Sequence, residues 1–204
     1  MKGGKSIVSR RSRGLLAGLA TAVCLCFFFL PLRHMAAPAK AAEVLVPSFG
    51  SGKVQVRLYT DYFCGPCSRM EPRIEALLSD LVHSNAITLT FIDTPVHSFT
   101  PLYAKYFLYI LKRDRSFPLV LRSRAVLFEA ARGKIEEPEG LEEFLKKNNV
   151  QFREFDPGPT LAALSGMIRE DNVRSTPTCV IIKDGRRGVF TGDIEIPRAL
   201  ELLK

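Results

Sequence analysis

Two cysteines separated by two residues lie between a predicted strand and a predicted helix, and this arrangement constrains the fold more than any other feature. Before them, residues 53–60 alternate between apolar and polar side chains, which is the pattern of a strand. After them, apolar residues recur with helical spacing to Leu81, and Pro72 inside this segment predicts a kink. Because residues 86–93 form a second β-rich run, the motif Cys64-Gly65-Pro66-Cys67 lies within a β-α-β unit.

The rest of the chain predicts a block of helices followed by a β-hairpin and a last short helix. Asp184-Gly185 marks the turn of the hairpin. The order is therefore β-α-β, helices, then β-β-α, which is an α/β domain over residues 42–204 with a helical insertion at about 98–171. Residues 43–52 are interpreted as a lead-in. The predicted helices cover residues 101–113, 117–132, 141–147, 158–171 and 197–203, and the predicted hairpin strands cover 178–183 and 188–191.

The first 41 residues carry the basic character of the chain. The sequence holds 29 Lys and Arg against 21 Asp and Glu, a net charge of +8. Seven of the basic residues and none of the acidic ones precede Ala42, so residues 42–204 hold 22 basic and 21 acidic side chains. A nearly neutral domain lacks the basic face that phosphate binding requires, and nucleic acid is therefore not expected as a partner.

The same 41 residues have the parts of an export signal. Basic residues precede the apolar run 15–30, and Ala39-Lys40-Ala41 fits the small-x-small pattern of a signal-peptidase site, which predicts Ala42 as the mature N-terminus. Because the run is almost long enough to span a bilayer, an uncleaved N-terminal membrane anchor is the alternative. In either case the basic flank stays in the cytoplasm, so the domain is expected in the periplasm.

Three of the five cysteines belong to the exported part. Cys24 and Cys26 fall in the apolar run and are interpreted as small apolar residues. An odd number of cysteines makes a poor disulfide framework, since Cys179 would have no partner. The spacing of Cys64 and Cys67, in contrast, is typical of a redox motif. An oxidising compartment allows such a pair to cycle as a disulfide. Cys179 alternates with buried strand positions and is predicted to be an inert core thiol.

The strand-to-helix junction gives the two thiols of the motif different chemistry. Cys64 lies at a helix N-terminus, where free backbone N–H groups and the helix dipole favour a reactive thiolate. Cys67 follows within one turn and can attack a mixed disulfide to release the product. Gly65 allows close approach of a partner backbone, and Pro66 suits the first helical turn. We therefore assign Cys64 as the attacking thiol and Cys67 as the buried resolving thiol.

A second motif, Ser175-Thr176-Pro177-Thr178, directly precedes the strand 178–183. Together with the CGPC motif it resembles the thioredoxin superfamily, and the helical insertion with Asp61-Tyr62-Phe63 resembles the DsbA-like branch, over about residues 44–204. The resemblance implies a thioredoxin fold with an inserted helical subdomain, and a cis Thr176–Pro177 bond that pairs with an extended substrate. It implies neither a cofactor nor a bound metal. The substrate-binding residues that it implies are Gly65, Pro66, Thr176 and Pro177.

The sequence departs from that branch in two places that bear on its chemistry. Such enzymes commonly have a buried acid six residues before the first cysteine, where this chain has Leu58, and Asp61 is expected nearer the surface. The Gly-Pro spacer is that of thioredoxins rather than of strongly oxidising DsbA enzymes. Two directions therefore stay open. An oxidase would form disulfides in exported proteins and be reoxidised by a quinone-linked membrane partner, whereas a reductase would draw on a membrane thiol electron donor. The architecture favours the oxidase.

Other classes of protein fit the sequence less well. Covalent haem attachment needs a histidine where Ser68 stands, and a zinc site or copper-chaperone module needs further ligands, for which His83 and His97 qualify by type only. His97 is itself predicted to be a solvent-facing or capping residue. A holdase would not need both cysteines of the motif. A dimeric isomerase needs an N-terminal dimerisation domain, for which residues 42–52 are too short, so a monomer is expected.

Overall fold

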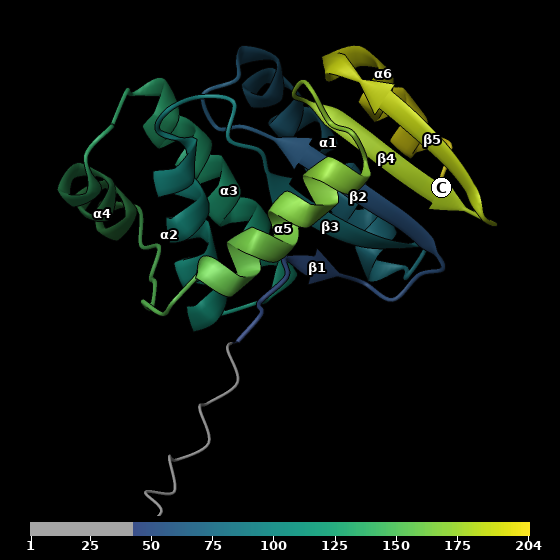
Figure 1. The fold of residues 1–204 in the computed structure, drawn as a ribbon. Helices are drawn as coiled ribbons and strands as arrows, with labels where there is room; N and C mark the ends of the chain where they lie inside the picture. Colours follow the sequence, from purple (N-terminus) through teal and green to yellow (C-terminus); the bar gives the residue numbers. More distant parts are fainter. Residues whose placement is uncertain (1–42) are drawn as a thin grey trace, which may run out of the picture. The chain divides into compact units, whose positions relative to one another are not determined.

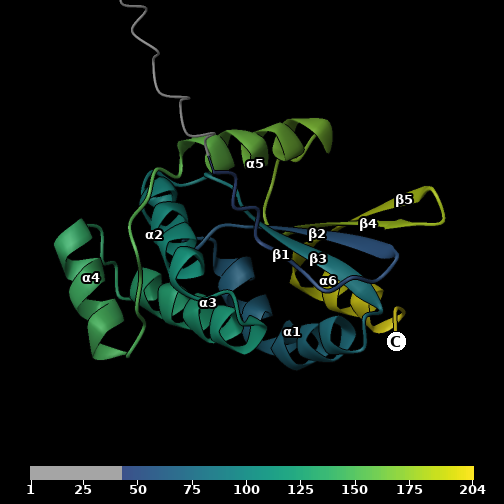
Figure 2. The same ribbon diagram turned by 90° about the horizontal axis from the view of Figure 1, so that it is seen from below.

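A five-stranded mixed sheet forms the centre of the part of the chain that the computed structural model describes, residues 43–204 (Figure 1). The strand order is β1-β3-β2-β4-β5, with β2 and β3 parallel and the other neighbours antiparallel. Helix α5 covers one face of the sheet, and α1 and α6 cover the other (Figure 2). The strands are β1 (Ser48–Phe49), β2 (Val54–Thr60), β3 (Ile87–Asp93), β4 (Thr178–Lys183) and β5 (Arg186–Thr191). The helices are α1 (Gly65–His83), α2 (Thr100–Arg113), α3 (Phe117–Arg132), α4 (Pro138–Lys147), α5 (Gly158–Glu170) and α6 (Gly192–Glu201).

This order confirms the thioredoxin-like α/β fold with helices between its two halves. The four helices α2 to α5 lie between β3 and β4, and α3 contacts α1, α2 and α4. The predicted leader, residues 1–41, lies outside the described residues. Within residues 43–204, no helix combines the length and the apolarity that crossing a membrane requires.

Several boundaries differ from the sequence-based prediction: α4 begins at Pro138 rather than at Leu141, and β5 begins at Arg186 rather than at Gly188. The segment interpreted as a lead-in contains β1, which pairs antiparallel with β3. The last helix begins at Gly192 rather than at Pro197, because Gly192 at φ +83° turns the chain directly from β5 into α6. Pro197 then lies inside the helix, where it cannot donate a hydrogen bond to the carbonyl of Asp193. Arg73 of α1 donates to that carbonyl instead, at 3.0 Å.

The main core lies between the sheet and α1 and extends among α2, α3, α4 and α6, and its local patterns explain where the cysteine motif lies. Helix α1 continues through Pro72 and buries an apolar stripe that begins with Cys67 and Met70. In the sheet, Leu58 pairs with Cys179 on one side and with Phe91 on the other. Leu58 and Cys179 are fully buried. Position 58, where the resemblance leads one to look for a buried acid, is therefore an ordinary core position here.

A buried cluster of charged side chains joins α1, α3 and the end of the sheet. Arg124 of α3 is fully buried and donates through Nε to Glu71 of α1. Its other nitrogens donate to Asp93 Oδ1 at 3.4 Å and to Thr60 Oγ1 at 2.9 Å. Tyr62 donates to the second oxygen of Asp93 at 3.3 Å. Buried charges require such partners, because an unpaired charge away from water is strongly unfavourable.

We predict that Asp93 makes the free energy of unfolding of the protein fall as the pH rises from about 4 to about 6. Burial raises the pKa of Asp93 to about 6, against the opposing charge of Arg124. Since this folded pKa lies above the unfolded value of about 3.9, the native state keeps a proton that the unfolded state has already lost. The Asp93→Asn variant lacks this titration. The free energy of unfolding of the variant minus that of wild type should therefore be about 3 kcal/mol larger at pH 7 than at pH 4.

Urea unfolding of the reduced protein at several pH values measures this difference. The matched control is Asp184→Asn, which makes the same substitution on the exposed hairpin turn, and the pH-dependent gain should be larger for Asp93→Asn than for this control. An equal or smaller gain for Asp93→Asn would contradict the prediction.

Candidate active site

The cysteine pair lies where β2 ends and α1 begins. Cys64 is the N-cap of α1, and its Sγ accepts a hydrogen bond from the backbone N–H of Cys67 at 3.3 Å. Both cysteines are free thiols, and the Cys67 thiol donates to Cys64 Sγ across 2.7 Å. Cys64 retains 6% exposure and lines a surface groove, whereas Cys67 is fully buried. A partner in solution can therefore reach only the first sulfur.

These contacts separate the acidities of the two thiols. The hydrogen bond from the Cys67 thiol lowers the pKa of Cys64 to about 6, although burial acts in the opposite direction. The same hydrogen bond, together with burial, raises the pKa of Cys67 far above its usual range. At neutral pH the site therefore holds a thiolate on Cys64 and a protonated thiol on Cys67. A thiolate is the reactive species in disulfide exchange.

The Thr176–Pro177 peptide bond is cis, as the resemblance implies, and it lies beside the cysteines. The carbonyl oxygen of Thr176 is 3.3 Å from Cys64 Sγ. This contact arises because β4, which starts at the next residue, pairs with β2 and so begins near the end of that strand. Pro177 is buried, and its carbonyl accepts a hydrogen bond from Gly192 at 3.0 Å.

The four predicted substrate-binding residues differ in how far they reach solvent. Gly65 is exposed at the start of α1, and a side chain there would meet only the end of Arg69, at 3.6 Å. Pro66 and Thr176 are half-buried, and Pro177 is buried. The fold thus brings two segments that are over a hundred residues apart in sequence to the same sulfur atom.

Asp61 is fully buried, which corrects the expectation that it lies near the surface. Its Oδ2 accepts hydrogen bonds from the backbone N–H groups of Val96 at 2.9 Å and His97 at 3.0 Å, and from the hydroxyl of Thr100 at 2.7 Å. Its Oδ1 accepts from the backbone N–H of Phe63 at 2.8 Å. The loop after β3 and the start of α2 therefore enclose this carboxyl group and bind it to the loop that carries Cys64.

His97 belongs to the same site, although the sequence indicated only a solvent-facing or capping residue. Its Nδ1 lies 3.0 Å from Asp61 Oδ1, and its side chain is 45% exposed. It lines the same groove as Cys64, and its ring centre is 6.3 Å from that of Phe63. The sequence feature that could have indicated this contact is Asp61, three residues before Cys64. A carboxyl group enclosed by the fold needs hydrogen-bond donors, and His97 is one of them.

The structure does not assemble the ligands that a metal site would need. Within residues 43–204, no three side chains of His, Cys, Asp or Glu lie close enough together to hold a metal ion. His83 is in the last turn of α1, whereas Cys64 caps the first turn of the same helix. The two candidate histidines are therefore at different places in the fold, with only His97 near the cysteines.

We predict that the reactivity of Cys64 follows a titration with a midpoint near pH 6, rather than near the usual value for a thiol. Below this midpoint the thiolate is protonated and alkylation slows. The Cys67→Ala variant loses the hydrogen bond that contributes most to the low pKa, so its midpoint should rise. Iodoacetamide labelling of the reduced protein across pH, read by mass spectrometry, measures both midpoints. A midpoint near pH 9 in wild type, or no rise in the variant, would contradict this account.

Comparison with known proteins supports the fold. No protein-family model and no curated protein sequence matches the chain. Among solved structures, the catalytic domain of Proteus mirabilis ScsC matches at 19% identity and a TM-score of 0.59, over 80% of this chain and 89% of that domain. A periplasmic thioredoxin-like protein from Salmonella enterica serovar Typhimurium matches at 16% identity and a TM-score of 0.60, over 80% and 90%.

A third match carries the name of the branch that the sequence resembles. The thiol-disulfide exchange protein alpha-DsbA2 from Wolbachia pipientis matches at 17% identity and a TM-score of 0.50, over 78% of this chain and 87% of that one. At such low sequence identities a structural likeness establishes the fold, whereas the activity must be argued from the residues of the site. The chain accordingly has the thioredoxin-like fold of ScsC and DsbA-like proteins, with the pair Cys64 and Cys67 at its strand-to-helix junction.

Proposed function

We propose that this protein is a periplasmic thiol–disulfide oxidoreductase that acts on cysteines of exported proteins. The observation that carries the proposal is the pair of sulfur atoms 2.7 Å apart, with the pKa of Cys64 lowered and that of Cys67 raised. The position of the pair at the N-terminus of α1, beside the cis Thr176–Pro177 bond, supports it. The likeness to a periplasmic thioredoxin-like protein and the predicted export signal support the compartment.

The chemistry needs only the two cysteines and a substrate. The Cys64 thiolate attacks a substrate disulfide, so that a Cys64–substrate bond forms, and the released substrate sulfur takes up a proton. Cys67 then gives up its proton and attacks Cys64, which forms the Cys64–Cys67 disulfide and releases the reduced substrate. The reverse sequence oxidises a substrate dithiol. Each turnover moves two electrons, and of the two protons that the reduced substrate gains at neutral pH, one is given up by Cys67 and one comes from solvent.

Four residues are proposed to hold the substrate during both steps. Gly65 and Pro66 leave the approach to Cys64 open, since the first has no side chain and the second begins the helix. Thr176 offers backbone next to Cys64 for pairing with an extended polypeptide, and Pro177, buried behind it, forms the cis bond with it. No cofactor is part of the proposal, and the protein is proposed to act as a monomer.

We propose the oxidising direction, with reoxidation by a quinone-linked membrane partner. A low pKa of Cys64 stabilises the reduced form, which makes the disulfide a stronger oxidant. A pKa of about 6 lies between the values of about 7 for thioredoxin and about 3.5 for DsbA. The second candidate is a reductase supplied by a membrane thiol donor, which the thioredoxin-type Gly65-Pro66 spacer favours.

The reduction potential of the purified protein, equilibrated in glutathione buffers, tests this proposal. We expect a value between those of thioredoxin, about −270 mV, and DsbA, about −120 mV. Below pH 6 reduction takes up two protons and the potential should fall by about 59 mV per pH unit. Above pH 6 Cys64 stays ionised, so the slope should be about 30 mV. A value at the thioredoxin end would favour the reductase, and the absence of a reversible two-electron couple would contradict both directions.

A further inference from the structure

We propose that the surface around Cys64 selects cysteines that are flanked by acidic residues in the substrate polypeptide. This inference rests on the proposed function, because it names the substrate class of the same site. Three observations carry it: a groove beside Cys64, basic side chains in that groove without acidic partners, and a nearly neutral charge for the domain as a whole.

The groove has a volume of about 620 Å³ and begins at the exposed edge of Cys64. One wall is the cysteine loop, from Tyr62 to Gly65, and the other is the end of α3 with the turn that follows it, at Arg132 and Lys134. This volume lies within the range of clefts that enclose ligands. The residues next to a substrate cysteine would therefore enter it when that cysteine reaches Cys64.

Positive charge predominates in the groove. Arg69, Arg132 and Lys134 line it, against Glu136 as the acidic residue. Arg69 is held by Asp193, with Nε 3.0 Å from a carboxylate oxygen.

The other two basic side chains of the groove have no such acidic partner. Arg132 donates to the hydroxyl of Ser68 at 2.9 Å, which leaves its charge uncompensated. Across residues 43–204, no ion pair within 4.0 Å engages Arg132 or Lys134. Both side chains are exposed, so a substrate carboxylate can reach them.

A further basic residue lies in the segment that leads to Thr176. Arg174 is exposed and stands two residues before Thr176, whose carbonyl contacts Cys64 Sγ. Its contact within the described chain is with the neutral side chain of Asn172, at 3.3 Å. Because residues 42–204 carry nearly equal numbers of acidic and basic residues, this concentration of positive charge is a property of the site.

Acidic flanking residues fit this surface better than neutral or basic ones. A carboxylate can accept two parallel hydrogen bonds from a guanidinium such as that of Arg132, whereas a lysine or arginine there would meet like charge. Complementary charge speeds encounter and disfavours wrong partners, and salt weakens both effects. The proposed preference therefore concerns the rate at which a substrate reaches Cys64.

The test uses reduced protein and peptides activated as 2-pyridyl disulfides. The Cys64 thiolate attacks the peptide sulfur, a Cys64–peptide disulfide forms, and the peptide–thiopyridyl bond breaks. The leaving pyridine-2-thiolate takes up a proton at its ring nitrogen and becomes pyridine-2-thione, whose absorbance gives the rate. Three peptides are compared, identical except that two Asp, two Asn or two Lys residues flank the cysteine. Each rate is divided by the rate of the same peptide with 2-mercaptoethanol.

At low ionic strength we expect the Asp peptide to react about tenfold faster than the Lys peptide, with the Asn peptide between them. In 0.5 M salt the ratio should shrink towards one. The double variant Arg132→Glu/Lys134→Glu should lose or invert the preference.

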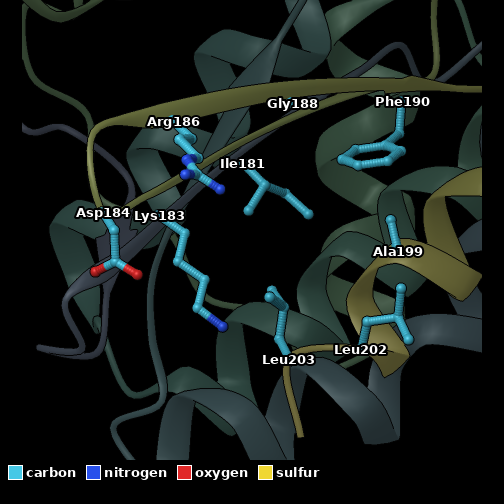
Figure 3. Close-up of a pocket in the computed structure, with 9 residues that line it drawn as sticks. All are labelled: Ile181, Lys183, Asp184, Arg186, Gly188, Phe190, Ala199, Leu202 and Leu203. Atoms are coloured by element: carbon cyan, nitrogen blue, oxygen red, sulfur yellow. The ribbon is translucent and has the colours of Figure 1, made fainter.

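The matched control is Lys183→Glu/Arg186→Glu, which changes the net charge equally at the opposite end of β4 from Pro177. There the two exposed basic residues border a separate pocket of about 420 Å³, between the β4–β5 hairpin and α6 (Figure 3). This variant should keep the preference for the Asp peptide.

The outcomes separate the two proposals. Each protein is also reacted with the neutral reagent 2,2′-dipyridyl disulfide. Normal reactivity with this reagent but equal rates for the three peptides would overturn the proposed selectivity and leave the redox function standing. Loss of the preference in the control variant would also overturn it, since overall charge would then be the cause. No reaction with the neutral reagent would contradict the proposed function itself.

Discussion

The Cys67→Ser variant is expected to accumulate stable mixed disulfides between Cys64 and its substrates. Cys64 keeps its place at the helix N-terminus and remains accessible, so the first exchange step proceeds. The second step has no nucleophile, because a serine hydroxyl does not displace a sulfur under these conditions. The Cys64→Ser variant should form no adducts, and its turnover of a dithiol substrate should fall on the order of 10³-fold or more.

Non-reducing gel electrophoresis and mass spectrometry of the purified, reduced variants mixed with a disulfide-bonded model protein measure this prediction. The control is Cys179→Ser, which alters a fully buried thiol on β4 and should leave adduct formation unchanged. Adducts in Cys64→Ser but not in Cys67→Ser would show that the roles of the two cysteines are reversed, and equal adduct formation would contradict the assignment of a single attacking thiol.

The Arg124→Met variant is expected to lose about 3–5 kcal/mol of unfolding free energy. Arg124 is fully buried and forms ion pairs with Glu71 and Asp93, which would otherwise be left as buried carboxyl groups without a cation. Methionine fills similar space but supplies no charge. The second variant, Arg124→Met/Glu71→Gln, should recover part of the loss, because it removes one of the two unpaired charges.

Chemical denaturation of the reduced proteins near neutral pH measures these differences. Arg122→Met is the matched control on the same helix. Arg122 is exposed and donates to the Asn148 carbonyl at 3.0 Å, so its loss should change stability by about 0.5 kcal/mol or less. If Arg124→Met behaved like this control, the cluster would contribute nothing to stability.

The parts of this fold that the sequence predicted are those determined by residues close together in the sequence. The alternation of β2, the helical period of α1 and the Asp184-Gly185 turn are local patterns, and the structure has a strand, a helix and a hairpin there. The CGPC motif could be placed at a strand end for the same reason. The start of α6 was missed because Pro197 looks like a first-turn residue, and only the contact from Arg73 explains its place inside the helix.

What the sequence did not predict depends on contacts between distant residues. Arg124 is 53 residues from Glu71 and 31 from Asp93, and nothing in the local pattern of α3 distinguishes it from an exposed arginine. Asp61 and His97 meet across 36 residues, through a loop whose path is set by the packing of α2. The two-residue strand β1 is too short to show a period.

The burial of Cys179 has a consequence for the lifetime of a protein that changes its disulfide state repeatedly. Three thiols in one domain permit three pairings, of which only Cys64–Cys67 is productive. Cys179 is fully enclosed in β4, and burial raises its pKa to about 12, so it remains protonated and out of reach. A wrong disulfide with Cys179 can therefore form only before the chain has folded. In the folded protein, each redox cycle forms the same Cys64–Cys67 disulfide again.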